Sequence, residues 1–519
     1  MTFPRKVGIL ILLVAAAAVA AYQMGLALPT LRWFYSFDAD PNSYTSGSWR
    51  EHQAQIVGHV LCGIMALAGL ILIIAGGNFH WNPLTLRKLT RFRSIGRGWL
   101  SFQILLALLF LAMLDQTLVG RRALAVKYEG KWSFPAFYRD EIKEKEFGGK
   151  SDQEQDYRAL KKSFASDNKG NAVIMPPIPW DPVFDSDDIQ RRTLEEKEGQ
   201  LHRPGEDHAL DGRAVQYWPD SPTVKLREVR FLKGVRDGTG TLYDGNGEFA
   251  GKQTWKEGKL VETSVEDSGP SRPDMPWIEL VYPPAAPSFE NKHFLGTDSK
   301  GWDIAAQLFG GFQVQFKAAT IYVALVYSIG IIIGSLMGYL GGTFDLIVDR
   351  LKEMLSNIPF LLVVMILAAY IGRDNITLTT IIMIFAIFSW IGVATYLRTA
   401  TYREKARDYV AAARVQGAGT LRVIFKHILP NAISTIVTLL PFSIAGVAAS
   451  LTALDFLGFG LPDRYPSWGR LLEDGTSNIT SPWIVSSSFG VMVFVLMLIT
   501  FVGEAIREAF DPKKFTTYQ

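Results

Sequence analysis

Cysteine is almost absent from this chain of 519 residues: there is one, Cys62, inside an apolar run. Disulfide bonds within the chain are therefore excluded, and any region outside the cytosol must be held together by packing and hydrogen bonds. A lone cysteine in apolar surroundings is most often a small packing residue, and we expect this for Cys62.

Charge is also scarce in long stretches, although Lys, Arg, Asp and Glu make up 20% of the chain. The almost charge-free runs are 7–27, 56–77, 99–118, 313–340, 356–372, 377–397, 430–452 and 485–503. A helix needs about 20 apolar residues to cross about 30 Å of hydrocarbon. We therefore expect eight membrane-spanning helices, of which 356–372 has the least certain ends.

Two energy sources have no support in the sequence. Secondary transporters keep ionisable groups inside their spans, and the runs hold essentially none, with Lys317 and Glu504 placed at the ends of theirs. A phosphate-binding loop is missing as well. The nearest match, FGGKS at 147–151, has Glu144 where the first glycine of such a loop belongs. If the chain moves a solute, the energy comes from another protein.

Basic residues are concentrated in a few segments, and such segments tend to face the cytosol. The segment 398–427 has seven Lys or Arg against two acidic residues, and 81–97 and the tail with Arg507, Lys513 and Lys514 are basic too. We predict that these segments and both termini are cytoplasmic. Alternation then places outside the membrane 28–55, 119–312 and 453–484.

The first 27 residues fit two descriptions. Arg5 and Lys6 precede an alanine-rich apolar run, which is typical of a cleaved signal peptide and of a retained anchor. We expect a retained helix, and in either case residue 28 lies outside.

The external part, 119–312, is polar and carries a β-rich pattern. Residues 222–265 alternate, and Asp237–Gly238 and Asn246–Gly247 are predicted hairpin turns of an antiparallel module at roughly 220–265. Six prolines between 270 and 287 predict an extended linker.

An acidic cluster precedes this module. It consists of Asp181, Asp185, Asp187 and Asp188. Because no His or Cys joins it at ligand spacing, we interpret it as a solvated loop rather than a metal site.

A polar segment between two apolar runs raises the sharpest question: DYVAAARVQGAGTLRVIFKHILPN, residues 408–431. Its alanines give a smooth helix face, its glycines permit a sharp turn, and Leu421, Ile424, Phe425 and Ile428 share one side at helical spacing. Such a helix can dock into a cleft of a soluble partner or anchor a loop to lipid headgroups. The residues alone leave both readings open.

This segment resembles the EAA loop of ABC-importer permeases, which reads Glu-Ala-Ala, three residues, Gly, nine residues, then Ile-x-Leu-Pro. The residues in register are Ala412, Ala413, Gly417, Leu429 and Pro430. The usual Glu is Ala411 here and the usual Ile is His427; Glu404 or Asp408 are the nearby substitutes for the glutamate. The resemblance implies that an ATPase subunit contacts Asp408, Tyr409, Ala412, Ala413, Arg414, Gly417 and Gly419.

Other segments agree with this family. HFLGTDSKGWDIAAQLFGG at 293–311 is similar to the segment before the second core span of dipeptide and oligopeptide permeases, with Trp302 in place of their Arg. GYLGGTFD at 338–345 and DFLGFGLPDRYPSWGRLLEDG at 455–475 also match. The resemblance implies a segment at the external gate, facing a binding protein, formed by Gly296, Thr297, Asp298, Gly301 and Asp303.

An external stretch adds a finer likeness. KYEGKWSFPAFY and MPPIPWDP resemble the microcin C and oligopeptide (Yej-type) permeases. The implied fold is an all-α polytopic membrane protein with eight spans, a MetI-like core and a small β-rich extracytoplasmic insertion. Its parts are a two-span N-terminal extension at 1–80, a basic segment and span at 81–120, an external region at 121–292 with the insertion at about 185–275, and the core at 293–512.

The resemblance also implies a function. The chain would be the permease subunit of an importer for peptides or peptide-like compounds in the plasma (inner) membrane of a Gram-negative bacterium. It would be no enzyme and bind no cofactor, since ATP and Mg belong to a separate ATPase. The expected partners are a second homologous permease, the ATPase, a periplasmic peptide-binding protein and lipid, but no nucleic acid. The alternatives are an ABC-coupled sensor or regulatory complex without translocation, and a membrane scaffold.

Overall fold

The structure is a computed structural model that describes residues 2–37, 51–75, 83–167, 170–183, 185, 190–204, 207–219, 221–264 and 275–510. Two compact units emerge from its contacts. The helical unit comprises Met1–Asp185, Lys292–Gly296 and Trp302–Gln519. The sheet unit comprises Ser186–Asn291 and Thr297–Gly301. Lys513 and Lys514, which were predicted to be cytoplasmic, lie outside the described residues. Asp187 and Asp188 of the acidic cluster lie outside them too.

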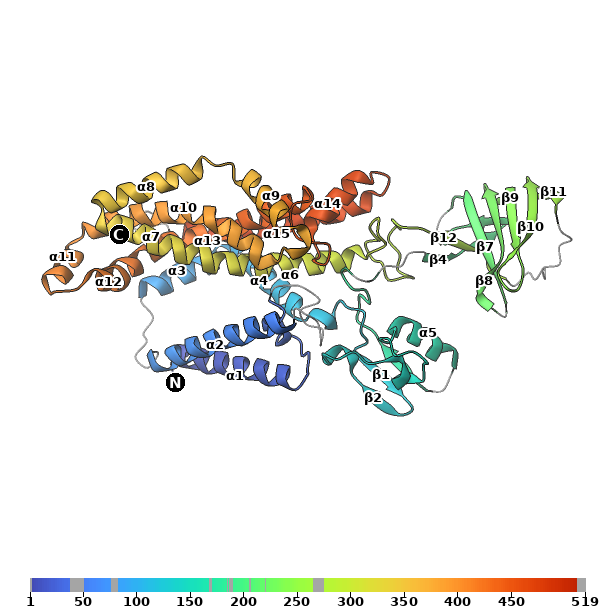
Figure 1. Ribbon diagram of the computed structural model, residues 1–519, viewed down its shortest axis with the longest axis horizontal. Coiled ribbons are helices and arrows are strands. Elements are labelled where there is room, and N and C mark those ends of the chain that lie inside the picture. The colour runs from blue at the N-terminus through green and yellow to red at the C-terminus, as the bar shows by residue number, and fades with distance from the viewer. Residues whose placement is uncertain are drawn as a thin grey trace. The chain divides into compact units, whose positions relative to one another are not determined.

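The helices all belong to the helical unit (Figure 1). In chain order they are α1 Phe3–Gln23, α2 Glu51–Ala75, α3 Pro83–Ser94, α4 Gly96–Met113, α5 Tyr157–Asp167, α6 Ile304–Tyr322, α7 Ser328–Leu340, α8 Gly342–Ser356, α9 Phe360–Ile371, α10 Leu378–Lys405, α11 Asp408–Val415, α12 Thr420–Arg422, α13 Leu429–Phe456, α14 Trp468–Ser477 and α15 Pro482–Phe510.

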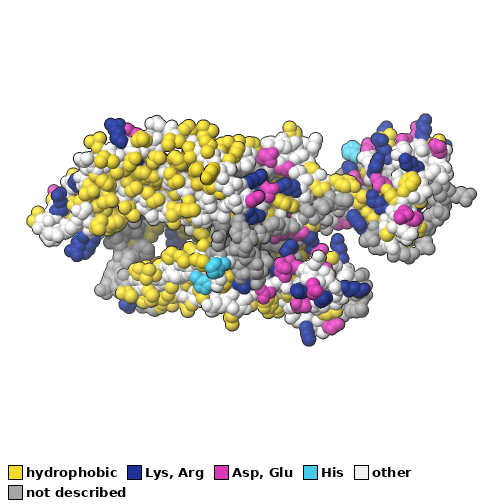
Figure 2. Space-filling view, in the orientation of Figure 1, with side chains coloured by type: hydrophobic (Ala, Val, Ile, Leu, Met, Phe, Trp, Pro, Cys, Tyr) yellow, Lys and Arg dark blue, Asp and Glu magenta, His cyan; other side chains and the backbone are white. Residues whose placement is uncertain are grey.

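Within the described residues, seven helices are long and apolar enough to cross a membrane, or eight if α8 and α9 together form one broken span. The expected number of spans is thus confirmed, but the run 356–372 is not a straight span. Helix α9 has 12 residues, about 18 Å at 1.5 Å per residue, and meets α8 at a bend of 74°. Figure 2 shows the hydrophobic surface of these helices, with basic side chains gathered near α11 and α12.

One span is unusually long. Helices α6 and α7 continue through a wide π turn, Val323–Tyr327, into a single helical path of 37 residues, Ile304–Leu340. Its inner half packs tightly on α10 through three glycines spaced four apart. A Cβ at Gly330 would lie 2.7 Å from Val393, and one at Gly334 would lie 2.5 Å from the carbonyl of Ala394. Small residues at such spacing let helix backbones approach closely in a membrane.

The N-terminal extension is a helical hairpin. Helices α1 and α2 cross where Gly8 and Gly69 meet, since a Cβ on either would lie within 3 Å of the other's carbonyl oxygen. Tyr22 stacks on Tyr35 with ring centroids 3.9 Å apart. Cys62 packs in the same cluster and is 3% exposed, which confirms its expected role as a packing residue.

The basic helix α3 packs beside the C-terminal end of α15. Phe92 lies among Ala505 and Ala509, and Lys88 lies over the ring of Phe510 at 4.7 Å. The two basic segments predicted to share one side of the membrane are therefore neighbours.

A small module follows α4. Strands β1 Ala125–Tyr128, β2 Lys131–Ser133 and β3 Ala172–Ile174 form a sheet in the order β2-β1-β3, and α5 packs against β3. For Asp185, the interpretation of the acidic cluster as a solvated loop was wrong. Asp185 forms two hydrogen bonds of 2.5 and 2.6 Å with the guanidinium of Arg158, which also lies over Trp180.

The sheet unit holds the remaining strands: β4 Gln190–Thr193, β5 Glu195–Lys197, β6 Gln200–His202, β7 Gly212–Trp218, β8 Ser221–Leu232, β9 Val235–Tyr243, β10 Phe249–Lys256, β11 Lys259–Thr263 and β12 Ile278–Val281. Seven of them form one antiparallel sheet in the order β11-β10-β9-β8-β7-β12-β4. Its core contains Leu194, Leu210, Val229, Phe231 and Trp277. The β-rich insertion is thus present.

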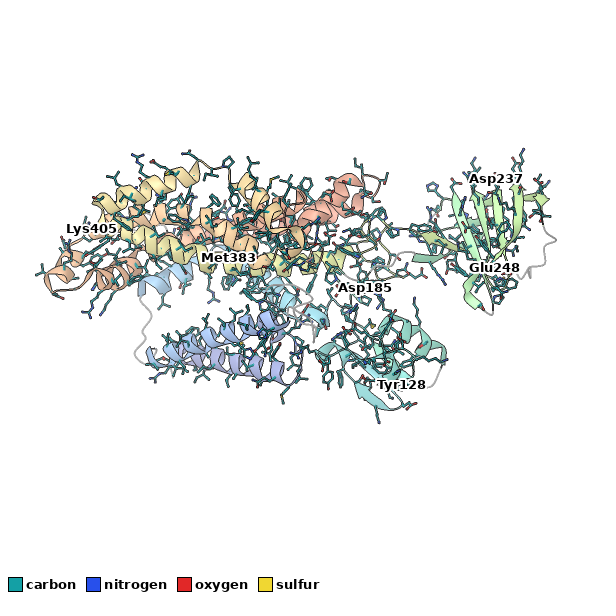
Figure 3. The ribbon with its side chains drawn as sticks, viewed as in Figure 1. Tyr128, Asp185, Asp237, Glu248, Met383 and Lys405 are labelled. Atoms are coloured by element: carbon teal, nitrogen blue, oxygen red, sulfur yellow. The ribbon has the colours of Figure 1, made fainter. Side chains whose placement is uncertain are left out.

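Two details of this unit differ from the prediction. Segment 278–281 was assigned to a proline linker, but it pairs with β4 and β7 as strand β12. Asp237–Gly238 is no hairpin turn, because it lies within β9 (Figure 3). The turn before β9 is formed by Lys233 and Gly234, both with positive φ.

The role of Asp237 explains that error. Its carboxylate accepts a hydrogen bond from the backbone N–H of Glu257, in the turn between β10 and β11. Asp237 therefore does stabilise a turn, but it is the turn between β10 and β11 rather than its own. Asn246–Gly247 does form the predicted turn between β9 and β10.

Candidate functional site

The predicted coupling loop begins where α10 ends. Lys405, the last residue of α10, donates a hydrogen bond of 2.6 Å to the backbone carbonyl of Tyr339 at the end of α7 (Figure 3). Helix α11 then starts at Asp408, whose negative charge suits the positive end of a helix dipole.

A tight turn reverses the chain after α11. Gly417 has φ +81, and its N–H bonds to the carbonyl of Arg414 while that of Ala418 bonds to Ala413. This pair of bonds is the Schellman motif, which requires a left-handed residue and therefore favours glycine. Gly419 has an ordinary extended conformation, with φ −70 and ψ 161, and precedes α12.

The base of the loop is packed against α7. Val410, Val423, Ile424 and Ile428 are at most 1% exposed and form one cluster with Tyr339. The loop is therefore a folded part of the helical unit, packed on the C-terminal end of α7.

The opposite surface of the loop is open. Ala411, Ala412, Arg414 and Val415 of α11 are exposed, and Val415 is 88% exposed. Ala413, also predicted to be a contact residue, is 7% exposed and faces inward.

One predicted face is divided. Leu421, Ile424, Phe425 and Ile428 were expected on one side, but Leu421 and Phe425 point outward while Ile424 and Ile428 are buried. The cause is the π turn at Val423–Ile428, whose wider turn breaks the α-helical spacing. The exposed surface thus combines apolar and basic side chains.

A hydrogen-bond network ties the start of α11 to α13. The hydroxyl of Tyr409 donates to Glu404 at 2.9 Å and accepts from the Asn431 amide at 3.1 Å. Burial, together with the hydrogen bond to Glu404, raises the pKa of Tyr409. The Glu404 carboxylate is engaged inside the loop, whereas Asp408 is exposed and has no side-chain partner among the described residues.

The predicted gate segment is built differently. Asp303 caps α6 by accepting a 2.7 Å hydrogen bond from the N–H of Ala306, and its second oxygen lies 2.8 Å from His293 Nδ1. Neither of these two side chains is exposed to solvent. Gly296 and Gly301 both have φ +82, the left-handed region that glycine adopts without strain.

The other two gate residues are buried as well. The hydroxyl of Thr297, 0% exposed, accepts a 2.8 Å hydrogen bond from the N–H of Ala285. Asp298 is 5% exposed and accepts from the N–H of Lys300. These side chains therefore hold the backbone of a turn and are not themselves exposed to a partner.

A further motif of the sequence, residues 455–475, is held by one buried carboxylate. Asp455 accepts hydrogen bonds from the N–H of Leu461 at 2.7 Å and from the Ser467 hydroxyl at 2.5 Å. A Cβ on Gly460 would collide with its Oδ1. Trp468 is 2% exposed and donates to the carbonyl of Leu308 on α6, so these residues close a loop between α13 and α14.

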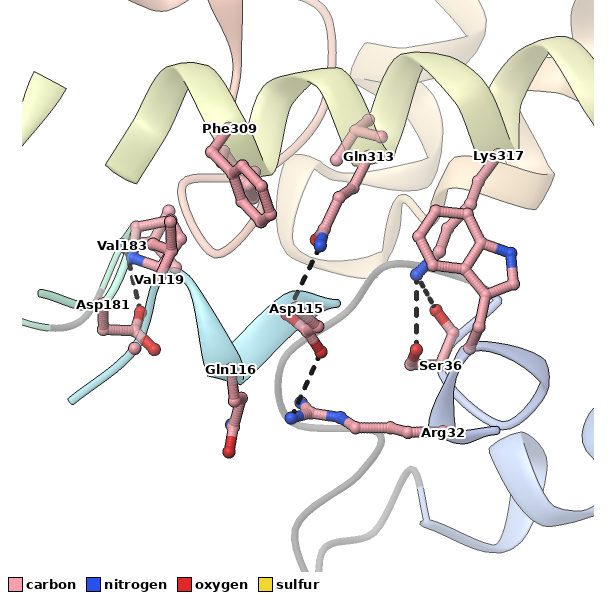
Figure 4. A pocket seen from close by; sticks show the side chains of 16 residues that line it. Arg32, Ser36, Asp115, Gln116, Val119, Asp181, Val183, Phe309, Gln313 and Lys317 are labelled. Atoms are coloured by element: carbon pink, nitrogen blue, oxygen red, sulfur yellow. Dashed lines mark hydrogen bonds and ion pairs between the residues drawn. The ribbon is translucent and has the colours of Figure 1, made fainter. Parts of the chain in front are cut away.

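Sequence reasoning missed a polar cluster between α6 and the segments that follow α1 and α4 (Figure 4). Lys317 was placed at the end of a run, but α6 begins 13 residues earlier and the lysine is 3% exposed. Its Nζ bonds to the backbone carbonyl of Ser36, lies 3.3 Å from the hydroxyl of the same residue and sits 4.5 Å over the Trp33 ring.

Neighbouring residues extend this cluster. Gln313 donates to the carbonyl of Ala112 at 2.8 Å and to Asp115 at 3.3 Å, and Asp115 pairs with Arg32 at 3.3 Å. A cavity of about 80 Å³ lies among these side chains. The cluster therefore fastens the N-terminal extension and α4 to α6. The signal that could have found it is a lysine within reach of an apolar run.

Known proteins similar in sequence include transport permeases. Residues 330–516, which include the coupling loop, match the family model of the binding-protein-dependent transport system inner membrane component. The peptidoglycan transport system permease protein YejE of Agrobacterium fabrum is 28% identical over 84% of this chain and 94% of its own length. The inner membrane ABC transporter permease protein YejE of Escherichia coli is 36% identical over 44% of this chain and 66% of its own.

Two further proteins are similar. The inward-facing structure of the MetNI methionine ABC transporter aligns with 40% of this chain and 96% of its own at 14% identity, with a TM-score of 0.30, too low to support a conclusion about fold. The oligopeptide transport system permease protein OppC of Haemophilus influenzae is 33% identical over 44% of this chain and 73% of its own length. Because the chain has an exposed loop with a glycine turn between membrane spans and is 33% identical to a permease, it belongs to the family of binding-protein-dependent transport system inner membrane components.

Proposed function

We propose that this chain is the permease subunit of an ABC importer for peptides or peptide-like compounds. Its observed relatives carry names of oligopeptide and peptidoglycan transport permeases. The observation that carries the proposal is the coupling loop: an exposed apolar and basic surface on α11 and α12, held by a buried base on α7.

The energy for transport comes, in this proposal, from a separate ATPase that holds ATP and Mg. The contact residues are the exposed Asp408, Tyr409, Ala412 and Arg414 of α11, while Gly417 shapes the turn beside them and Gly419 precedes α12. Asp408 replaces the glutamate that the EAA loop usually has at position 411, because the other candidate, Glu404, is engaged by Tyr409.

Alternating access follows from the packing of this loop. Closure of the ATPases pushes on α11, and the push reaches the inner end of α7 through the contacts of Val410 and Lys405 with Tyr339. Rigid elements that share a packed interface shift together. A second homologous permease completes the pathway, and a periplasmic peptide-binding protein delivers the cargo.

The proposed location is the inner membrane, with both termini and the coupling loop in the cytosol and residues 119–312 in the periplasm. The supporting observations are the basic residues of α3 and α11–α12 and the contact between α3 and the end of α15. A single introduced cysteine at Arg414, in a Cys62→Ser background, is expected to react with a membrane-impermeant maleimide only after the cells are opened.

Two measurements test the function. The ATPase subunit should co-purify with the chain in mild detergent, and the Arg414→Cys variant should crosslink to it. Reconstituted complex should take up labelled peptide in an ATP-dependent manner. ATPase binding without uptake would favour the sensor or regulatory complex, and absence of the ATPase would favour a membrane scaffold.

The sheet unit is proposed to shape binding-protein docking, because it is inserted directly before residues 293–311. Replacing Ser186–Asn291 by a short linker should weaken the stimulation of ATP hydrolysis by the binding protein. This deletion removes the whole sheet, whereas one limited to 220–265 would remove β8 to β11 and leave β7 without its neighbour β8. Unchanged stimulation would refute this role.

A further inference from the structure

A cavity of about 550 Å³ lies in the small module that β1, β2, β3 and α5 form. Every described residue that lines it belongs to residues 128–171 of the helical unit, so it is a feature of one folded part. Its size falls within the range of small-molecule sites, and its lining includes both aromatic and carboxylate side chains. None of its described lining residues belongs to the predicted coupling loop or gate segment.

The floor of the cavity is aromatic. The rings of Tyr128 and Phe164 stack with their centroids 5.9 Å apart and 8° between planes, and Phe147 meets Tyr128 edge-on at 6.0 Å. Phe147 and Phe164 are less than 10% exposed and belong to the module's core. The floor is therefore preformed, and aromatic surfaces of this kind attract both apolar stems and cations.

Two carboxylates, Glu129 and Glu144, stand at the rim on turns of fixed backbone. Glu129 has φ +48 in the turn between β1 and β2, and its N–H donates to the Asn171 side chain at 3.1 Å. Glu144 opens a short 3₁₀ helix whose end is capped by Gly148 in the left-handed region. Their positions are thus set by the backbone.

The charge state of the rim distinguishes it from its surroundings. Nearby carboxylates are paired: Glu154 with Arg121 and Arg122, and Asp152 with Lys143 and Lys145. Among the described residues, Glu129 and Glu144 have no side-chain partner, and no described lining residue is Lys or Arg. Within the described part of the chain, the cavity thus combines an apolar aromatic floor with two carboxylates that no ion pair engages.

We propose that this cavity binds a primary ammonium group carried on an apolar stem, such as a lysine-like side chain or the amino terminus of a peptide. The stem packs on Tyr128 and Phe164, and the ammonium donates to Glu129 and Glu144. An ammonium has three donors and forms its strongest hydrogen bonds with carboxylates.

The proposed function indicates which ligand this site would bind. The assignment of the ligand to peptide cargo rests on that function and on residues 119–312 facing the periplasm. The site would hold cationic cargo beside the entrance and raise its local concentration. The binding chemistry itself rests only on the cavity, and it is tested on the purified full chain without ATPase or binding protein.

Calorimetric titration of the full chain in detergent provides the test, with three peptides. The first is acetyl-Ala-Lys-Ala-amide, the second is the same peptide acetylated at the lysine Nε, and the third is Ala-Ala-Ala-amide with a free amino terminus. The first should bind, and the second should bind at least about 10-fold more weakly because it has lost its charge. Binding of the third as tight as the first would show that the site accepts amino termini and lysine side chains alike, and weaker binding would assign it to side chains.

Variants locate the site. The double variant Glu129→Gln/Glu144→Gln should weaken binding of the first peptide by about 10-fold, since two partly exposed carboxylates are lost. Glu146→Gln is the matched control: it lies on the same 3₁₀ helix but outside the lining, and affinity should stay within about 2-fold. Thermal unfolding of each variant reports whether the module remains folded.

The proposal is overturned by any of three results: equal binding of the acetylated and free lysine peptides, unchanged affinity in the folded double variant, or no heat of binding with either ammonium peptide. Each of these would leave ATPase co-purification and peptide uptake untouched, so a failure here is distinguishable from a failure of the proposed function.

Discussion

The coupling loop and the gate segment were found by the same kind of motif match, yet the structure uses their residues in opposite ways. In the loop, Asp408, Ala412 and Arg414 are exposed and their side chains are available to a partner. In the gate segment, Thr297, Asp298 and Asp303 are buried and bonded within the chain.

This difference separates two reasons for a family motif. A motif with buried side chains specifies a backbone shape, whereas one with exposed side chains is able to specify a contact. Burial therefore predicts which substitutions lower the stability of the permease and which lower its coupling to a partner.

The largest difference should come from two aspartates. Asp303→Ala removes a helix cap and leaves His293 without its buried partner, so we expect a loss of about 3 kcal/mol in the free energy of unfolding. Asp408→Ala, at an exposed position, should leave stability within about 0.5 kcal/mol. Thermal unfolding of both purified variants measures the difference in stability. Equal melting temperatures would contradict the distinction between the buried gate segment and the exposed loop.

The second test concerns Thr297. Thr297→Val keeps the shape of the side chain but leaves the buried N–H of Ala285 without its acceptor, at a cost of about 2 kcal/mol. Thr297→Ser retains the hydroxyl and should be clearly more stable than the valine variant in the same unfolding experiment. The reverse order would show that the hydrogen bond does not hold this turn.

A third test uses the two glycines of the coupling loop. Gly417→Ala places a side chain at φ +81 and should cost about 1 kcal/mol, shifting the loop and reducing co-purification of the ATPase. Gly419→Ala, at φ −70 with open space around it, is the control and should behave as the unmodified chain. Equal ATPase binding by the two variants would contradict a role for the turn.

The smallest effect is expected at Tyr409. Tyr409→Phe removes the hydroxyl that joins Glu404 to Asn431, and because this network is largely exposed the loss should be about 0.5 kcal/mol. The freed Glu404 carboxylate should partly replace Asp408, so Tyr409→Phe should lessen the coupling defect of Asp408→Ala. ATPase activity of the single and double variants checks this; additive defects would exclude such compensation.

The spans and the loop could be predicted from sequence because both depend on residues that are close together along the chain. Long apolar runs fix the helices, and the glycine spacing of 408–431 fixes the turn. The division of Leu421 and Phe425 from Ile424 and Ile428 could not be foreseen, since a single π turn changes which residues share a face.

Long-range partners were the second limit. Lys317 meets Ser36 across 281 positions, and Asp303 meets His293 only because a left-handed glycine at 296 folds the chain back. Likewise, strand β12 pairs with β7 and β4 although prolines flank it. Sequence periodicity does not encode such pairings, so the burial of the predicted gate residues could not be foreseen.

The helical path from Ile304 to Leu340 has one more consequence. Its 37 residues measure about 55 Å, nearly twice the roughly 30 Å thickness of the lipid hydrocarbon. Modest tilting cannot absorb the surplus, so several turns must project into water. The helical path therefore carries the end with Tyr339, the end with Asp303, or both beyond the lipid hydrocarbon.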